Sequence, residues 1–210
     1  RSTQSSRSFR VWAGGVSLKV MTDELLVAPG TFLAAWPDLQ DPNFMHGVLF
    51  MCQHSPEGAY GLVVNRRTEL TMGELMPEHP LLGELDFPVY LGGPVDHGSM
   101  QFLHRVPSFV TGGVPLTDTI FLGGELESLA QYLATSPEEA RDNVRIFLGY
   151  SGWGAGQLEG ELATGSWLPA PANNNAVFGA AGEDLWRQVI RSARPDGEDL
   201  ENLPPDVQWN

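Results

Sequence analysis

Three residues in one apolar stretch of the sequence have the types and the spacing for nucleophilic chemistry. His46, Cys52 and His54 lie within residues 44–54 and are separated by even numbers of positions. If this stretch is one unbroken strand, the three side chains lie on the same face. Cys52 and His54 then stand about 6.6 Å apart along the strand. This spacing suits a thiol activated by an imidazole, as in a hydrolase or another thiol-dependent enzyme.

The same face also favours a second interpretation, in which these residues are structural. Val48 and Phe50 share the parity of Cys52, and a cysteine among apolar neighbours is usually an inert core residue. Cys52 is the only cysteine of the chain, which excludes an internal disulfide and a cysteine-only metal site. No other histidine or carboxylate has the spacing of a metal ligand. The sequence therefore predicts neither a metal nor another cofactor.

A second candidate site consists of glycine-rich turns that follow strand-like stretches. Gly92-Gly93-Pro94 follows one such stretch, and residues 149–160 follow another and lead into a helix. Glycine has no Cβ, so the backbone can approach a ligand or a partner chain closely. Neither turn matches a phosphate-binding or dinucleotide-binding motif. The alternative is that the glycines serve only the tight packing of turns against the sheet.

We expect Asn65 and Arg66, at the end of a strand, to meet these two turns on one side of the domain. Arg66 is one of few cations in an acidic body, so it could receive an anionic group, or it could pair with Glu159 or Glu161 as a structural residue. The residues expected to bind a ligand or a partner are Asn65, Arg66, Gly92, Gly93, Pro94, Gly152, Trp153, Gly154 and Gln157.

Short strands must position these candidate residues. The apolar stretches 44–54 and 59–65 flank a turn with Pro56 and Gly58, which predicts a central hairpin covered on both faces. Thr71 and Glu74 have the spacing of a capping box at the start of a short helix. Further strands are expected at 31–36, 88–91, 99–105, 118–122 and 144–149, and further helices at 125–134, 157–162 and 183–194. Strands and helices do not alternate regularly, which indicates an α+β domain.

The two ends of the chain differ in composition from its middle. Residues 1–20 contain four basic residues and no acidic one, and we expect them to form a flexible arm outside the fold. Residues 195–210 are rich in acids and prolines and are expected to form an acidic tail. The sequence thus predicts one α+β domain over residues 21–194.

The charge of the chain limits its partners. Twelve basic and 26 acidic residues give a net charge of −14 at pH 7, which repels nucleic acids and anionic membranes. No segment has the pattern of a secretory signal or approaches 18 consecutive apolar residues. We therefore expect a cytoplasmic monomer whose partner is a small molecule or a protein, and not a nucleic acid or a membrane.

Several motifs, in order and well spaced, carry a resemblance to a known family. They are Phe32–Ala35 with Pro37, Leu39–Phe44, Cys52–His54, Gly58–Arg66, Val89–Val95, and Gly149–Leu162 with Trp167. From about Gly30 to Ile190 the sequence resembles the YqgE/AlgH family of bacterial proteins. It has Arg67, Ser151 and Ala155 where that family usually has Pro, Ala and Pro.

This resemblance implies a fold and a class of function. The fold is a single α+β domain with a mixed, bifurcated sheet, part of which closes like a small barrel, surrounded by helices. One branch of the family is named as a regulator of alginate production, which implies a role like that of a transcriptional regulator, and no catalytic residue carries over. The leading prediction is a non-catalytic binding or regulatory module. The alternative is a hydrolase or thiol-dependent enzyme that uses Cys52 and His54.

Overall fold

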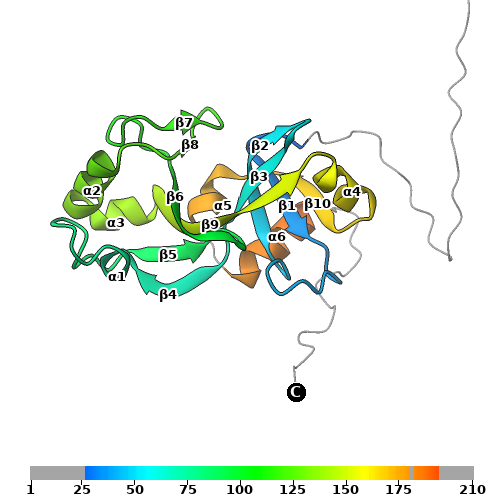
Figure 1. Cartoon of the computed structure of the whole chain (residues 1–210), viewed down its shortest axis with the longest axis horizontal. Coiled ribbons are helices and arrows are strands. Elements are labelled where there is room, and N and C mark those ends of the chain that lie inside the picture. Colours follow the sequence, from blue (N-terminus) through cyan, green and yellow to red (C-terminus); the bar gives the residue numbers. More distant parts are fainter. Residues whose placement is uncertain (1–26, 180–181, 194–210) are drawn as a thin grey trace, which may run out of the picture.

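One long strand, β9 (Val144–Gly154), organises the fold of the described chain (Figure 1). The computed structural model describes residues 27–179 and 182–193. The predicted arm at 1–20 and the predicted acidic tail at 195–210 lie outside the described residues, as do the outer bounds of the predicted domain.

The sheet forks at β9. One edge of β9 pairs with antiparallel β6 (Val95–His104). The other edge pairs with two strands, antiparallel β3 (Gly58–Val63) along its second half and parallel β5 (Pro88–Leu91) along its first half. The sheet is therefore mixed and bifurcated, which confirms the fold class predicted from the sequence.

The remaining strands extend the arms of this fork. Beyond β3 the order is β2, β1 and β10; beyond β5 lies β4; and beyond β6 lie β8 and β7. Their bounds are β1 Thr31–Ala35, β2 Val48–Ser55, β4 Arg67–Thr71, β7 Val114–Pro115, β8 Phe121–Leu122 and β10 Trp167–Pro171. The sheet curls so strongly that β7 and β8 come round toward the start of β1, which leaves a concave face between them.

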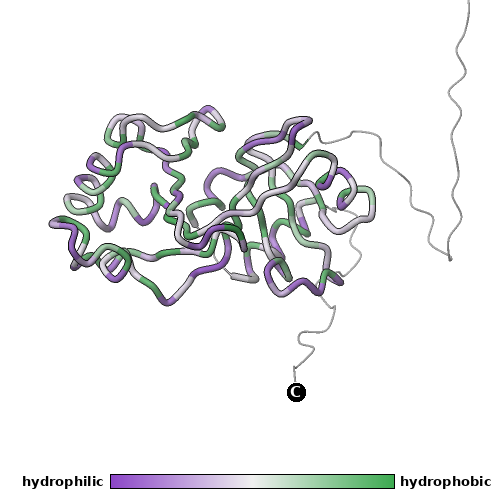
Figure 2. Tube along the Cα trace, viewed as in Figure 1, coloured by the Kyte–Doolittle hydropathy of each residue, from purple (hydrophilic) through white to green (hydrophobic). Residues whose placement is uncertain are grey.

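The predicted hairpin is confirmed as β2 and β3, and it is covered on both faces. Val48, Phe50 and Cys52 belong to one hydrophobic cluster, whereas Leu49 and Met51 belong to another. The strand begins at Val48, four residues later than the predicted start, because the chain turns before it. Figure 2 shows the contrast: β1 and β2 are largely hydrophobic, and the turn that connects them is largely hydrophilic.

The helices of the described chain cover the sheet in three groups. Helices α1, α2 and α3 pack on the arm that holds β5, whereas α5 and α6 cover the concave face of the other arm and α4 covers its opposite face. Their bounds are α1 Met72–Leu75, α2 Leu126–Thr135, α3 Pro137–Arg141, α4 Gln157–Ala163, α5 Asn174–Phe178 and α6 Glu183–Ala193. The capping box of Thr71 and Glu74 is present at α1. Within the described residues, none of the helices has the length and apolar character needed to cross a membrane.

Candidate functional site

The concave face of the curled sheet holds an open groove of about 630 Å³. Polar groups come from β2, β3 and β6, and an apolar wall comes from β7, β8 and the segment that enters β1. The lining residues are Pro29, Cys52, Gln53, Tyr60, Gln101, Val114, Pro115, Leu116 and Leu122. None of the nine is charged, so the groove is suited to an uncharged ligand.

A glycine lets the curled sheet close at one end of this groove. Gly30 has a φ of +86°, and a Cβ at this position would lie 2.5 Å from Cγ2 of Thr117. Thr117 belongs to the turn between β7 and β8. The missing side chain of Gly30 therefore allows that turn to rest against the start of β1.

Tyr60 places an unsatisfied hydroxyl beside the groove. Its oxygen is buried and has no hydrogen-bond partner among the described residues, and its ring lies 5.2 Å from that of Tyr150. Burial raises the pKa of Tyr60, and the nearby Cys52 thiol and Tyr150 hydroxyl raise it further. The hydroxyl therefore stays protonated and can donate and accept hydrogen bonds. An unpaired buried group of this kind costs about 1–3 kcal/mol.

Cys52 lies at the floor of the groove as an unactivated thiol. It is 5% exposed, and its Sγ donates to the carbonyl of Phe50 at 3.6 Å. Burial raises its pKa strongly. The nucleophilic form of cysteine is the thiolate, so this environment suppresses the reactivity that a thiol-dependent enzyme requires.

The predicted pairing of Cys52 with His54 on one face is wrong, because β2 is not an unbroken strand. The register with β3 shifts between Met51 and Gln53, and such a bulge turns the following side chains to the other face. Cys52 packs in the cluster on the concave side, whereas His54 contacts Glu159 of α4 on the opposite side.

His46 also departs from the expected arrangement. It precedes β2 with a φ of +54°, and its ring packs 4.4 Å from that of Trp186. The three residues that suggested nucleophilic chemistry therefore lie in three different environments.

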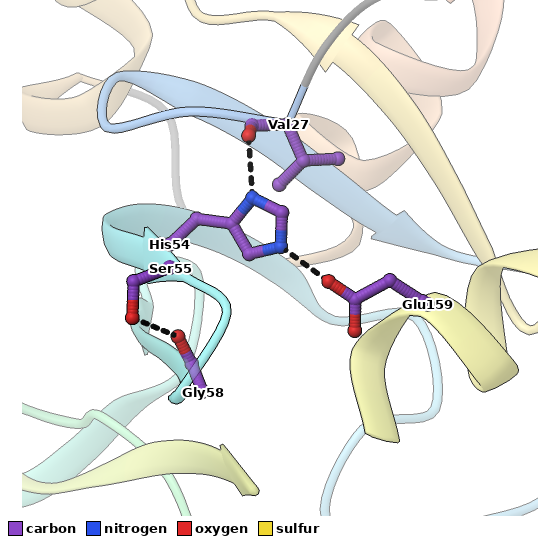
Figure 3. Close-up of polar contacts among 5 residues, drawn as sticks. All are labelled: Val27, His54, Ser55, Gly58 and Glu159. Atoms are coloured by element: carbon purple, nitrogen blue, oxygen red, sulfur yellow. Dashed lines mark hydrogen bonds and ion pairs between the residues drawn. The ribbon is translucent and has the colours of Figure 1, made fainter. Parts of the chain in front are cut away.

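His54 has both ring nitrogens engaged (Figure 3). Nδ1 lies 2.8 Å from the carbonyl oxygen of Val27, and Nε2 lies 2.8 Å from Oε1 of Glu159. The pKa of Glu159 is lowered by its own backbone N–H and also by the hydrogen bond from His54. The His54 ring therefore links the hairpin to the entry of β1 and to α4.

Asn65 and Arg66, which follow the end of β3, form hydrogen bonds with the backbone of neighbouring segments. Asn65 Oδ1 accepts from the N–H of Val48 at 2.8 Å, and its Nδ2 donates to the carbonyls of His46 and Gly182, both at 2.9 Å. Its side chain therefore links residues 46–48 and Gly182 to the end of β3.

Arg66 donates to the carbonyls of Pro42 and Met45, at 2.7 and 2.9 Å. It therefore contacts neither Glu159 nor Glu161, the two acids considered from the sequence. Burial lowers the pKa of Arg66.

Gly92 and Gly93 pack tightly against the neighbouring strands. The carbonyl of Gly92 accepts from the N–H of Val63 at 2.8 Å and from Oγ of Ser151 at 3.3 Å. Gly93 has a φ of +152°, and a Cβ there would lie 2.3 Å from the carbonyl of Tyr150. These two glycines therefore serve the packing of the fork, while the following Pro94 is exposed.

Gly152, Trp153, Gly154 and Gln157 form the junction between β9 and α4. Trp153 is only 7% exposed, and its Nε1 donates to Oε2 of Glu161 at 2.9 Å. Gln157 Nε2 donates to Oε1 of Glu161 at 3.1 Å, and Gln157 Oε1 accepts from the N–H of Gly154 at 3.1 Å. These contacts hold α4 against the sheet.

The structure brings the Gly92-Gly93 turn against β3 and β9, but it does not bring Asn65 and Arg66 to Trp153. Trp153 pairs with Ala59, at the beginning of β3, whereas Asn65 and Arg66 follow its end. Six residues of extended chain separate Ala59 from Asn65, a distance of about 20 Å. The expected shared site is therefore not formed.

The groove was not expected from the sequence. Tyr60 and Leu122 lie in apolar stretches that read as core, and Gln53 and Gln101 are isolated amides. The only local signal is that a tyrosine within an apolar strand carries a hydroxyl that needs a partner. Within the described residues, no three His, Cys, Asp or Glu side chains gather as metal ligands.

Comparisons with known proteins agree on one family. A sequence profile described as AlgH-like matches residues 32–197. A UPF0301 protein of Chlorobaculum tepidum is 38% identical over 173 residues, which cover 82% of this chain and 90% of that protein. A UPF0301 protein of Cytophaga hutchinsonii is 36% identical over 188 residues, which cover 88% of this chain and all of that protein.

Solved structures share the fold. The solution structure of the AlgH protein from Pseudomonas aeruginosa is 29% identical, with a TM-score of 0.63 over 86% of this chain and 95% of that one. The crystal structure of protein DIP2367 from Corynebacterium diphtheriae is 24% identical, with a TM-score of 0.62 over 83% of this chain and 90% of that one.

Proposed function

Because this chain belongs to the AlgH-like family, we propose that it uses the fold of that family as a non-catalytic binding module, with the groove of the curled sheet as the binding site. The ligand is a small uncharged molecule with an apolar body and at least one hydrogen-bonding group. The observation that carries this proposal is the unpartnered Tyr60 hydroxyl beside a groove that has no charged lining residue.

The chemistry of the lining supports this class of ligand. Val114, Leu116 and Leu122 offer apolar contact, whereas Gln53 and Gln101 offer amide donors and acceptors. A charged ligand would lose its hydration without gaining an opposite charge, which is unfavourable. An uncharged ligand with a carbonyl or amide group can satisfy the Tyr60 hydroxyl after a small change in the χ1 angle of Tyr60.

Binding without catalysis fits the two groups that otherwise suggested an enzyme. Burial keeps the Cys52 thiol protonated, and both ring nitrogens of His54 are already engaged. Neither side chain is poised to act on a molecule in the groove.

We further propose that the protein acts as a monomer in the cytoplasm, with no nucleic acid or membrane as partner. The net charge of −14 supports this setting. A regulator-like role follows if an occupied groove changes how the surface around it is recognised by a protein.

Three ring compounds that differ only in charge test the proposal. Benzamide is neutral, benzoate is an anion and benzamidine is a cation. We expect benzamide to shift the backbone amide resonances of Cys52, Gln53 and Gln101 in a saturable way, and the two ions to leave them unchanged. In the Tyr60→Phe variant the affinity for benzamide should fall about fivefold, which corresponds to one hydrogen bond of about 1 kcal/mol.

Three outcomes would contradict the proposal. They are no response to benzamide, an equal response to all three compounds, and shifts confined to residues away from the groove. Turnover of any compound that is lost in a Cys52→Ser variant would favour the thiol-dependent enzyme instead.

A further inference from the structure

The two hydrogen-bond partners of the His54 ring determine how many protons the ring must carry to satisfy both. Its two ring nitrogens each face an oxygen at 2.8 Å, the Val27 carbonyl on one side and the Glu159 carboxylate on the other. A carbonyl and an ionised carboxylate can only accept hydrogen bonds, and a neutral imidazole has only one N–H to donate. Both contacts are therefore satisfied at once only when the ring carries two protons.

The groups that face His54 agree with a protonated ring. Glu159 faces it from α4, and the described part of the segment that enters β1, from residue 27 onward, presents the Val27 carbonyl (Figure 3). Glu57 lies in the turn of the same hairpin, and a hydrogen bond from Ser55 lowers its pKa, so it too is negative at neutral pH. No basic residue forms an ion pair with Glu159 among the described residues. The pKa of Glu159 is lowered, so this carboxyl group stays ionised at neutral and mildly acidic pH.

The clasped segment is also one wall of the groove. Pro29 lines the groove two residues after the Val27 carbonyl, and Cys52 and Gln53 line it just before His54. Loss of one ring proton leaves a nitrogen lone pair facing an oxygen, either Nε2 against the Glu159 carboxylate or Nδ1 against the Val27 carbonyl, and either contact is repulsive. That contact must then open, and the hold on the entry of β1 weakens.

We propose that His54, Glu159 and the Val27 carbonyl form a proton-dependent clasp that closes the β1 side of the groove when His54 is protonated and loosens it when His54 is neutral. The use of this clasp to regulate ligand binding rests on the proposed function. The clasp itself does not depend on any ligand.

The single cysteine offers a readout that needs no ligand. Cys52 lies in the groove, so its rate of reaction with 4,4′-dithiodipyridine reports how often the groove wall opens. Dividing each rate by that of the denatured protein at the same pH removes the change in thiolate fraction of an ordinary cysteine. The comparison is made at pH 5.5 and pH 8.5, near the two ends of the range of about pH 5–8 in which histidines titrate.

Two variants separate the clasp from a merely structural contact. In Glu159→Gln the side-chain amide can donate to Nε2 of a neutral His54 ring, while Nδ1–H still donates to Val27, so the clasp no longer needs the second proton. In His54→Phe the ring volume remains but neither hydrogen bond forms. Circular dichroism checks that both variants are folded.

We expect the normalised rate of the wild-type protein to rise about tenfold from pH 5.5 to pH 8.5, which corresponds to the loss of one hydrogen bond of about 1.4 kcal/mol. The Glu159→Gln rate should stay low at both pH values, and the His54→Phe rate should be high at both. A wild-type rate that does not change with pH would overturn the clasp, as would the same rise in Glu159→Gln. A benzamide result of either sign leaves these outcomes unaffected.

A direct measurement of the ring completes the test. Nitrogen-15 shifts of His54 at pH 5.5 should show a proton on both Nδ1 and Nε2 in the wild-type protein. At pH 8.5 we expect a single proton on the ring. A neutral ring at pH 5.5 would contradict the proposal.

Discussion

The Tyr60 hydroxyl shows how a single atom can lower the stability of a fold. It is buried beside the groove without a partner among the described residues. Such groups are retained where a ligand or a function uses them, since an apolar replacement of the same shape is neutral or stabilising. The unfavourable free energy of burying this hydroxyl without a partner is therefore a property of the ligand-free protein. A bound ligand that pairs with the hydroxyl would remove it.

We predict that Tyr60→Phe raises the free energy of unfolding by about 1–2 kcal/mol, because it removes the unpaired hydroxyl and keeps the ring. Urea denaturation at neutral pH measures the change. Tyr150→Phe, which alters the neighbouring half-exposed ring, is the matched control and should change stability by less than about 0.5 kcal/mol. A loss of stability in Tyr60→Phe would mean that the hydroxyl has a partner.

His104 is a buried histidine that makes the fold sensitive to acid. It is 0% exposed, its Nε2 has no partner among the described residues, and burial lowers its pKa below the ordinary value of 6.5. The unfolded chain therefore binds a proton at this residue at a higher pH than the folded protein does. Its contribution to stability is complete above pH 6.5 and declines as the pH falls below that value.

We predict that a His104→Phe variant loses less stability than the wild-type protein between pH 7 and pH 5. The variant should still pack, because His104 already stacks on Phe121 with ring centroids 5.4 Å apart. Urea midpoints measured across this range report the difference. Identical slopes for the two proteins would disprove the prediction.

At the level of elements, a glycine at the fork allows a backbone conformation and a close approach of strands that a residue with a side chain does not. Gly93 lies where β5 leaves the sheet, with a positive φ and the carbonyl of Tyr150 in the space that a Cβ would fill. Gly98, within β6, has ordinary backbone angles, and its Cβ would meet only Oδ1 of Asp96, at 3.7 Å. The two positions thus differ in strain although they are close in sequence.

We predict that Gly93→Ala lowers the free energy of unfolding by about 3 kcal/mol or more, because backbone strain and a steric clash add together. Gly98→Ala should change it by less than about 1 kcal/mol. Thermal denaturation of the two variants provides the comparison. Equal melting temperatures would show that the fork tolerates a side chain at Gly93.

The sequence predicted elements better than it predicted their arrangement. The hairpin, the capped helix and the helices near 125–134, 157–162 and 183–194 were found because periodicity and turn residues are local signals. Strands β4, β7 and β10 and helices α3 and α5 were missed. Trp167–Pro171 contains two prolines and forms a strand only because β1 pairs with it.

The candidate site was predicted less well, for a physical reason. The even spacing of Cys52 and His54 was correctly read, but one bulge reverses the parity, and a bulge depends on the partner strand. Arg66 was expected to pair with Glu159 or Glu161 or to receive an anionic group, and it instead donates to two carbonyls of a loop. The groove arises from the curl of the whole sheet, so no local pattern indicates it.

For the molecule as a whole, β9 joins three hydrophobic clusters into one structure. Phe147 belongs to the cluster under α6, Ile146 to the cluster under α2, and Trp153 to the cluster under α4. Arg145 adds a further link, since its guanidinium donates to the carbonyls of Val64 and Gly179 and lies over the ring of Tyr90. We therefore expect the arms of the fork to unfold together.

We predict that the described domain unfolds in one cooperative transition. Tryptophan fluorescence, which reports mainly on the arm with Trp153 and Trp167, should have the same denaturation midpoint as far-ultraviolet circular dichroism, which reports on all elements. Calorimetric and van't Hoff enthalpies should agree. Two separated transitions would show that the arms are independent.

The position of β9 in the chain has a consequence for synthesis on the ribosome. Eighty residues separate the end of β3 at Val63 from the start of β9 at Val144. At about 5–20 residues per second, the ribosome needs about 4–16 s to reach the strand that β3, β5 and β6 all require. During that interval three strand edges are without their partner, so the nascent chain is most vulnerable to misassembly just before its central strand emerges.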